Sequence, residues 1–343
     1  MNPIYNYLQY EGIYYKEYKN YIIQEGVLVM NNNEAFLINA STNNEENARP
    51  ILTIGIPTYN REQFLRKCLE NIYSQVGNDP RIEVLVCDND SADNTCTIID
   101  EYKQKYKTLV YYKNPANIGV SKNIQKVLEL SKGEYINLHG DDDYFNEEVY
   151  SAIINMVNSN RDCDLMYITT GWHSLNIKRG MGLSNYQIDS GTGGWISGMV
   201  IKNDAYKKII QKEKFLYSNL NHIYIQLELL RNNPNYCILS GHISRADTGS
   251  AGASGYNIME VAIKNYLDIL YSFRNNGLTE GEIAYHKVAS LAITFPIIRR
   301  IIQSRLPLSI DGGIEIFTEY YSSEPYFDSK LEELKSILDL KVY

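Results

Sequence analysis

The sequence predicts an α/β protein with a mainly parallel central sheet and helices on both faces. Between residues 51 and 138, short apolar runs alternate with segments whose apolar residues recur at helical spacing. This is the pattern of consecutive βαβ units. Polar, turn-forming and acidic residues follow every apolar run. Because ligands of such folds bind at the carboxyl ends of the strands, these turns predict a site.

Each element follows from its local pattern. The apolar runs predict four strands, over 51–57, 82–87, 108–112 and 134–138. Helical spacing predicts three helices between them, over 60–76, 94–106 and 120–133. Asn60 and Gln63 have the spacing of a capping box, Asp93 is placed to cap the second helix, and Gly133 to close the third.

The chain is expected to have three parts. Residues 1–49 form an N-terminal extension with short strands and a polar linker. Residues 50–255 form the α/β domain, in two halves, 50–145 and 146–255. Residues 256–343 are helical, and their closing amphipathic segment is suited to docking on the body of the protein or on a second copy.

Composition excludes several classes of protein. The 343 residues are 44% hydrophobic and 22% charged, with a net charge of -8, which argues against general nucleic-acid binding. Five scattered cysteines without CxxC spacing predict free thiols in a reducing cytoplasm. No apolar run approaches the roughly 20 residues that span a bilayer, and the first residues lack the pattern of a signal peptide. A cytoplasmic location is expected, with at most peripheral membrane contact.

Three consecutive carboxylates, Asp141, Asp142 and Asp143, follow the fourth predicted strand. Adjacent carboxylates repel one another, so such a cluster is either a wet acidic turn or a site that holds a cation. Polar residues also end the other three strands. Because polar residues follow all four strands, a cation site is favoured over a solvent-exposed acidic turn.

At this point the stretch from about 51 to 145 resembles the family 2 glycosyltransferases with the GT-A fold. The resemblance is carried by "ILTIGIPTYNR", "EVLVCDNDSADNT", "NIGVSKNIQKVLELSKGEYI" and "LHGDDDY", and it continues more weakly to about residue 250. Such enzymes move a sugar from a nucleotide diphosphate, most often UDP, to an acceptor hydroxyl. They usually do so with inversion and with Mn or Mg.

The resemblance implies roles for individual residues. It places nucleotide and donor contacts at Pro57, Thr58, Tyr59, Arg61, Asp88, Asn89, Gly119, Lys122, Asn123, Asp141 and Arg245. Asp88 is expected to accept a hydrogen bond from the base, and Asp141 to bind the ribose. Asp142 is the first choice for a metal ligand and Asp143 the second, with His242 as a further candidate. The family's usual Asp-x-Asp-Asp pattern has Gly140 in its first position here.

The second half is expected to hold the acceptor. The segment 191–204 resembles the family's sugar-binding segment, with Gly194, Trp195 and Ser197 near donor sugar and acceptor; a Gly-rich turn with a core tryptophan is the alternative. Many relatives carry a catalytic Glu-Asp pair where this chain has Asn221 and His222. His222 is therefore the candidate base, with Asp204 and Glu228 as reserves.

The sequence thus predicts a metal-dependent glycosyltransferase of the hexosyltransferase type, which takes a UDP-sugar and a glycan, lipid-linked or protein-linked acceptor. Bacterial surface polysaccharide or glycoprotein glycan synthesis is the expected setting. A non-catalytic sugar-nucleotide-binding module is the alternative. A nucleotidyltransferase is disfavoured, because the turn after the first strand has no glycine.

Overall fold

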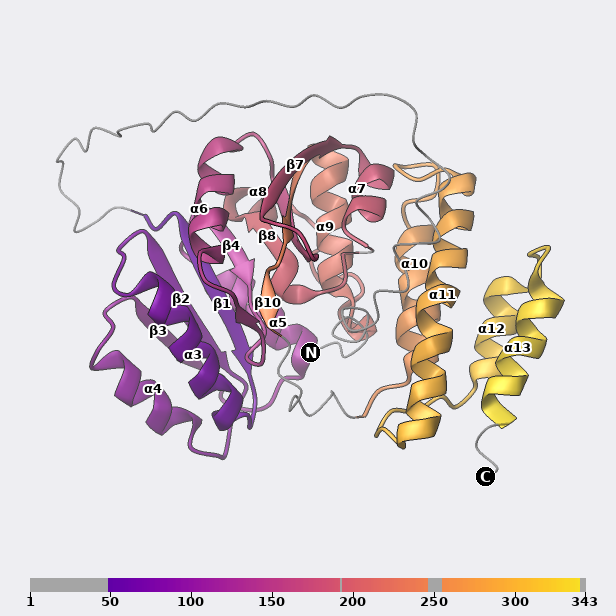
Figure 1. The fold of residues 1–343 in the computed structure, drawn as a ribbon, viewed down its shortest axis with the longest axis horizontal. Coiled ribbons are helices and arrows are strands. Elements are labelled where there is room, and N and C mark those ends of the chain that lie inside the picture. Colours follow the sequence, from indigo (N-terminus) through magenta and orange to yellow (C-terminus); the bar gives the residue numbers. More distant parts are fainter. Residues whose placement is uncertain (1–48, 192, 246–254, 340–343) are drawn as a thin grey trace.

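The computed structural model describes residues 49–191, 193–245 and 255–339. The strands predicted within residues 1–48 lie outside this range, as do residues 192, 246–254 and 340–343. Eight strands form one sheet with the order β3-β2-β1-β4-β8-β6-β9-β7. The sheet is mixed, and helices cover it (Figure 1).

The first half confirms the predicted βαβ pattern. Its strands are β1 (Leu52–Thr58), β2 (Ile82–Asp88), β3 (Leu109–Lys113) and β4 (Tyr135–Leu138), all parallel. Its helices are α3 (Glu62–Val76), α4 (Thr95–Lys103) and α5 (Val120–Leu130). Every residue of β1, β2 and β4 is buried, as expected for parallel strands covered on both faces.

The start of α3 differs from the prediction, whereas Asp93 Oδ1 accepts from Thr95 N at 3.1 Å at the start of α4, as predicted. Asn60 adopts a φ of 49° and its side chain accepts from Ala92 N, so α3 begins without a capping box. Instead, Asp93 Oδ2 accepts from Glu62 N at 2.9 Å, and Glu62 Oε2 accepts from Asn94 N at 2.6 Å. The starts of α3 and α4 therefore satisfy each other's free N–H groups.

The second half adds strands of both directions. They are β5 (Tyr144–Phe145), β6 (Leu165–Thr170), β7 (Asn176–Met181), β8 (Met199–Lys202), β9 (Asn235–Gly241) and β10 (Ser244–Arg245). Strand β8 is antiparallel to β4 and β6, and β9 is parallel to β6. The carboxyl ends of β6 and β9 therefore lie at the same edge as those of β1 and β4. Strand β10 pairs with β5 in a separate two-stranded ladder.

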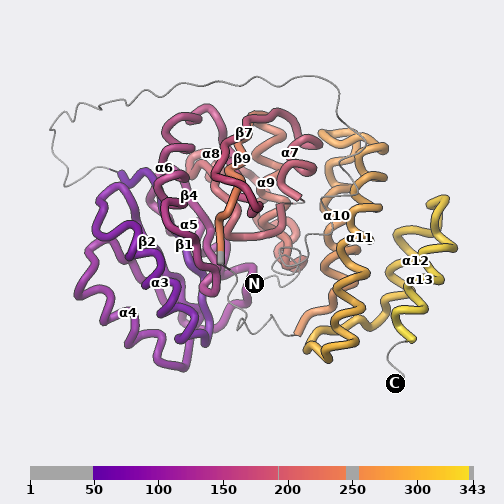
Figure 2. The backbone as a smooth tube through the Cα atoms, in the orientation of Figure 1, coloured from indigo at the N-terminus to yellow at the C-terminus, as the bar shows by residue number. Residues whose placement is uncertain are grey.

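The helices of the second half are α6 (Val149–Ser159), α7 (Leu183–Asp189), α8 (Asn203–Lys208) and α9 (Asn221–Asn232). The predicted helical C-terminal region comprises a π-helical turn, η4 (Glu260–Asn265), then α10 (Tyr266–Tyr271), α11 (Glu280–Ser304), α12 (Gly313–Tyr321) and α13 (Phe327–Asp339). This region packs beside the domain (Figure 2). The isoleucines near the end of α11, Ile297, Ile298 and Ile301, are buried. Among the described helices, none combines the length and apolar character of a membrane span.

Gly133 lies where the chain enters β4, and it does not close α5, which ends at Leu130 with Ser131 as its C-cap. The Gly133 N–H donates to Thr53 Oγ1 at 2.8 Å. A Cβ at Gly133 would lie 2.5 Å from Thr53 N and 2.8 Å from Leu52 C. The absence of a side chain thus lets the start of β4 contact β1.

We expect Gly133→Ala to lower the free energy of unfolding by about 1–3 kcal/mol, because the clash is with backbone atoms that cannot move aside. Urea denaturation measures the change. Gly281→Ala is the control, since Gly281 is exposed in the first turn of α11 with nothing within 4 Å of an added Cβ. It should be neutral or stabilising by up to about 1 kcal/mol. Equal effects in the two variants would show that Gly133 is not a packing constraint.

Candidate functional site

The carboxyl ends of β1, β2 and β4 bring the predicted polar residues to one edge of the sheet. Thr58, the last residue of β1, is paired with Asp88 at the end of β2. On the other side of β1, His139 N donates to Gly55 O at 2.8 Å, directly after β4. The acidic turn, which we define as residues 140–143, comes next in the chain and therefore lies beside the carboxyl end of β1.

Thr58 and Arg61 hold the first two carboxylates of the acidic turn. Thr58 Oγ1 donates to Asp141 Oδ2 at 2.7 Å, and Arg61 Nε donates to Asp141 Oδ1 at 2.9 Å. A second guanidinium nitrogen of Arg61 donates to Asp142 Oδ2. Charge-assisted bonds of this kind are stronger than neutral ones. Arg61 thus balances part of the negative charge in this turn.

Trp195 and Ser197 hold the third carboxylate. Trp195 Nε1 donates to Asp143 Oδ2 at 3.0 Å, and Ser197 Oγ donates to the same oxygen. Ser197 Oγ also accepts from Gly140 N at 2.8 Å. The segment from the second half of the domain therefore fixes the acidic turn at Gly140 and at Asp143.

Burial raises the pKa of Asp141 and that of Asp143 above the usual range of a carboxyl. At Asp141 the Arg61 charge opposes this rise in pKa, while the neighbouring Asp142 adds to it. At Asp143 the negative charge of Asp142 also raises the pKa, and the hydrogen bonds from Ser197 and Trp195 oppose it. The turn therefore holds its charge at a cost that a cation would lower.

Asp142 supplies the atom that best fits a metal ion. Its Oδ1 is buried and has no hydrogen-bond partner, which is costly for a carboxylate. Both oxygens of Asp141 and the Oδ2 of Asp143 accept hydrogen bonds from side chains. Within residues 49–191, 193–245 and 255–339, no three His, Cys, Asp or Glu side chains form a metal-binding group. Mg is often held by one or two carboxylates together with substrate phosphates, so the donor set fits Mn or Mg.

Asp88, the predicted contact for a base, is fully buried. Its Oδ1 accepts from Ser91 N at 2.8 Å, and its Oδ2 accepts from the Tyr111 hydroxyl at 2.7 Å. Each oxygen still has a free lone pair, but because the side chain is fully buried, a base can reach Asp88 only if neighbouring residues move aside. The nucleotide role of Asp88 stays a prediction.

Asn89 and Asn123, also predicted donor contacts, belong to a network of buried amides. Asn114 Nδ2 donates to the side-chain oxygens of both, at 3.1 and 2.9 Å, and Ile118 N donates to Asn89 Oδ1 at 3.0 Å. The network holds the loop that leads to Gly119. In this structure the two asparagines position the loop rather than face an open site.

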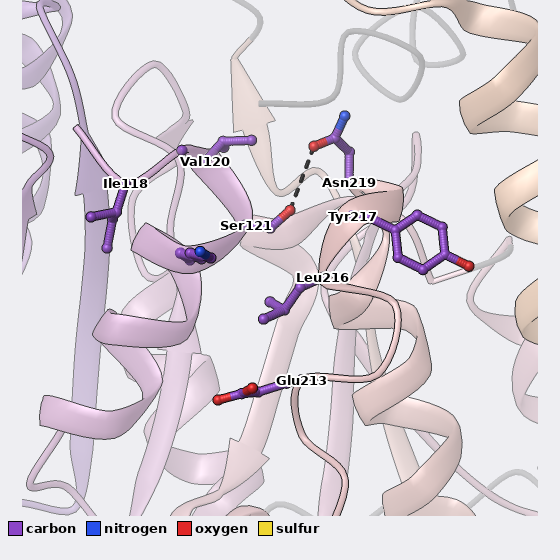
Figure 3. Close-up of a pocket in the computed structure, with 9 residues that line it drawn as sticks. Ile118, Val120, Ser121, Glu213, Leu216, Tyr217 and Asn219 are labelled. Atoms are coloured by element: carbon purple, nitrogen blue, oxygen red, sulfur yellow. Dashed lines mark hydrogen bonds between the residues drawn. The ribbon is translucent and has the colours of Figure 1, made fainter.

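Gly119 and Lys122 line an open groove of about 470 Å³. Gly119 precedes α5 with a φ of 85°, a conformation that favours glycine. The opposite wall comes from the loop around η3 (Leu216–Ser218), where Ser121 Oγ donates to Asn219 Oδ1 at 3.5 Å (Figure 3). The groove is lined by Ile118, Gly119, Val120, Ser121, Lys122, Glu213, Leu216, Tyr217 and Asn219.

The two ends of the Pro57–Tyr59 turn differ in exposure. Pro57 and Thr58 are buried in β1, whereas Tyr59 is 42% exposed. Tyr59 therefore offers the open ring of this turn, as expected for a residue that stacks on a base.

Trp195 does not offer an open face for a sugar, contrary to the prediction. It is 8% exposed and packs edge-on against Phe145, with ring centroids 6.0 Å apart. Its backbone N–H and carbonyl both bond the Tyr167 hydroxyl. The alternative of a core tryptophan is correct, and the polar end of its ring is used to hold Asp143.

Comparison with known protein families decides what this arrangement is. The model for Glycosyl transferase family 2 matches residues 53–210. These residues form a glycosyltransferase family 2 domain. The match includes the acidic turn, Arg61, Asp88 and Trp195, so the resemblance drawn from the sequence is confirmed.

Curated relatives match this family 2 domain over part of their length. Abequosyltransferase RfbV of Salmonella typhimurium is 24% identical over 55% of this chain and 63% of its own length. The minor teichoic acid biosynthesis protein GgaB of Bacillus subtilis is 29% identical over 39% of this chain and 16% of its own length. The chain therefore spans less than two thirds of these relatives.

A solved structure, S. aureus TarS 1-349 in complex with UDP-GlcNAc, has the same fold. Its TM-score is 0.58 at 16% identity, over 84% of this chain and 89% of TarS 1-349. The GT-A fold expected from the resemblance is therefore confirmed, and the similarity includes much of the second half.

One of the two reserve bases, Asp204, lies at the edge of the sheet opposite the acidic turn. Asp204 follows β8, which runs antiparallel to β4, so it lies where β4 begins and pairs with Arg49 at 3.0 Å. Glu228 lies six residues beyond His222 in α9, about 9 Å along the helix, and forms an ion pair with Arg231. The sequence could not show that β8 reverses direction. Asp204 is therefore removed from the candidate bases of the family 2 domain.

His222 lies in the first turn of α9 and is buried. Its Nε2 lies 2.9 Å from Gly194 O, and since a carbonyl only accepts, Nε2 carries the hydrogen. Burial lowers the pKa of His222 to about 4, while the bond to Gly194 opposes this. The imidazole is therefore neutral at pH 7, with its lone pair on Nδ1.

His242 and Arg245 lie just after β9. His242 is exposed, and its ring is nearly parallel to that of Trp172, at 22° and 6.3 Å between centroids. Arg245 Cα is paired with that of Tyr144, beside the acidic turn. Trp172 was not among the site residues predicted from the sequence; its one signal there is an aromatic residue after a strand end.

We expect His222→Gln to cost less stability at pH 4.5 than at pH 7. Above pH 6.5 His222 is neutral in the folded and unfolded states alike. As the pH falls from 6.5 towards 4, His222 is protonated in the unfolded chain but stays neutral in the folded protein, because its pKa is lower there. The free energy of unfolding therefore falls by up to about 2–3 kcal/mol through this group.

Urea denaturation at the two pH values checks this expectation. Ile223→Val is the control, because Ile223 is a fully buried neighbour without a charge, and its cost should be the same at both pH values. An equal cost of His222→Gln at pH 4.5 and 7 would contradict the lowered pKa.

Proposed function

We propose that the chain is a metal-dependent, inverting glycosyltransferase. It transfers a sugar from a nucleotide diphosphate donor, a UDP-sugar as is most frequent in the family, to a hydroxyl of a glycan, lipid-linked or protein-linked acceptor. In the transfer, a bond forms between the acceptor oxygen and the anomeric carbon, the bond from that carbon to the diphosphate breaks, and the acceptor proton passes to a base.

The observation that carries the proposal is the buried, unpartnered Oδ1 of Asp142 within the acidic turn of the family 2 domain. Asp142 is the proposed metal ligand, with Asp143 second. A bound Mn or Mg would act as a Lewis acid towards the departing diphosphate. Thr58 and Arg61 orient Asp141 for the ribose, and Trp195 and Ser197 keep Asp143 in place.

The remaining donor contacts follow from the same edge of the sheet. Tyr59 is open to stack on the base. Lys122 is exposed in the groove, and its side chain forms no hydrogen bond or ion pair with the described residues. It is a free cation for a phosphate or a sugar hydroxyl. Gly119 lets a ligand approach the backbone closely.

His222 is the proposed base that accepts the proton of the acceptor hydroxyl. The hydrogen bond to Gly194 makes Nδ1 the accepting atom. Its low pKa keeps the imidazole unprotonated at neutral pH, but also makes it a weak base.

The relatives support the class of donor and product. The TarS structure is a complex with UDP-GlcNAc, and the names of RfbV and GgaB refer to sugar transfer and to teichoic acid biosynthesis. A cell-surface polymer or glycoprotein glycan is therefore the proposed product. A cytoplasmic location, with at most peripheral membrane contact, is part of the same proposal.

Metal-dependent hydrolysis of a panel of UDP- and GDP-sugars, with and without Mn, tests the function. An enzyme slowly cleaves its own donor, whereas a binding module gains thermal stability with the donor and cleaves nothing. If no sugar nucleotide of the panel is cleaved and none raises the thermal stability of the protein, the proposed function is wrong.

Asp142→Asn should abolish Mn-dependent donor cleavage while leaving the melting temperature within a few degrees of the wild type. The substitution keeps the shape of the side chain but removes the charge that a divalent cation requires. We expect a loss of at least about 100-fold, the size of effect seen when a key electrostatic group is removed.

The matched control is Asp204→Asn, which removes a carboxylate at the opposite edge of the sheet. It should leave donor cleavage unchanged. Mn-dependent turnover that survives Asp142→Asn would assign the metal to another carboxylate.

A further inference from the structure

Trp172 is held in the open at the carboxyl edge of the sheet. It lies two residues beyond Thr170, the last residue of β6, and is 86% exposed. The loop around it is fixed by backbone bonds, from Gly171 N to Gly241 O at 2.6 Å and from His242 N to His173 O at 3.0 Å. These bonds fix the loop, so the large apolar ring of Trp172 is exposed to solvent at a defined position.

His242 backs this ring without covering it. The two rings are nearly parallel, at 22°, with centroids 6.3 Å apart. Because 86% of Trp172 remains accessible, the indole still has a free face. A flat aromatic surface with a polar neighbour suits a ligand that is apolar on one face and hydroxylated at its rim.

Hydrogen bonds connect this surface to the acidic turn. Asn146 Nδ2 donates to His242 O at 3.0 Å, and Asn146 N donates to Ile243 O at 2.7 Å. Asn146 comes three residues after Asp143. The aromatic surface therefore stands beside the segment that leaves the proposed metal site.

We propose that Trp172, backed by His242, is a platform for a pyranose ring of the acceptor glycan. The inference rests on the proposed function and deepens it. The C–H face of a pyranose can stack on the indole, while its hydroxyls reach water and the polar rim. An acyclic polyol phosphate has no such face, so the platform selects an acceptor whose terminal unit is a sugar ring.

Tryptophan fluorescence gives a direct test, because the sequence contains two tryptophans and Trp195 is buried. The probes are cellobiose, lactose and N,N'-diacetylchitobiose, with ribitol 5-phosphate as the acyclic comparison. At least one disaccharide should quench or blue-shift the emission, and ribitol 5-phosphate should not. The Trp172→Phe protein should lose the spectral change.

Kinetics supply the second readout. In transfer assays with the disaccharide that binds, Trp172→Ala should raise KM for the acceptor by about 10-fold, the range of one aromatic contact. Trp172→Phe should restore much of the affinity. Hydrolysis of the donor without acceptor should be unchanged in both variants, which separates this proposal from the proposed function.

Ile210→Ala is the matched control, since Ile210 is 96% exposed on a different loop, and it should change neither readout. The proposal is overturned if no disaccharide alters the emission, or if Trp172→Ala leaves acceptor KM unchanged. It is also overturned if Trp172→Ala changes only the oligomeric state, measured by light scattering, since the ring would then contact a second copy. Donor hydrolysis that fails in the wild type while the disaccharide still quenches would instead count against the proposed function alone.

Discussion

The balance between Arg61 and the acidic turn is the constraint on which the site depends. Two carboxylates about 4 Å apart repel by roughly 4 kcal/mol at an effective dielectric constant of about 20. The acidic turn places three in succession in a setting where Asp141, Asp142 and Asp143 are at most 7% exposed. Arg61 bonds the first two and Trp195 the third. The buried Oδ1 of Asp142 is left without a donor, and that is where a cation would be most stabilising.

The neighbours of Arg61 in the chain link the acidic turn to the turn after β2. Asn60 N donates to Ser91 Oγ, and Ser91 N in turn donates to Asp88. The crossed bonds between Glu62 and the start of α4 fix the same region. The proposed metal ligands in the acidic turn and Asp88, the proposed contact for the nucleotide base, therefore belong to one hydrogen-bonded unit. A displacement at Arg61 would disturb both ends of a bound donor.

The sequence predicted the first half of the fold well and the second half poorly, for physical reasons. Parallel strands buried on both faces appear as continuous apolar runs, so β1, β2 and β4 were found within a residue or two. The reversal at β8 leaves no local signal, so the sequence could not show that Asp204, a reserve candidate for the base, lies at the opposite edge of the sheet from the acidic turn. Asn60 fits a capping box by spacing, but the side chain bonds the next turn instead. Contacts between distant segments decided each of these cases.

Two tryptophans illustrate why burial, rather than residue type, assigns a role. Trp195 follows Gly194 and Trp172 follows Gly171, so their local sequences look alike. Trp195 enters the core beside Phe145 and uses only its N–H, as a donor to Asp143. Trp172 leaves the core at the end of β6 and remains 86% exposed, with His242 beside its ring. The first therefore stabilises the charge of the acidic turn, and the second remains available to a ligand. Sugar stacking was predicted for Trp195, yet the exposed ring suited to that chemistry is Trp172.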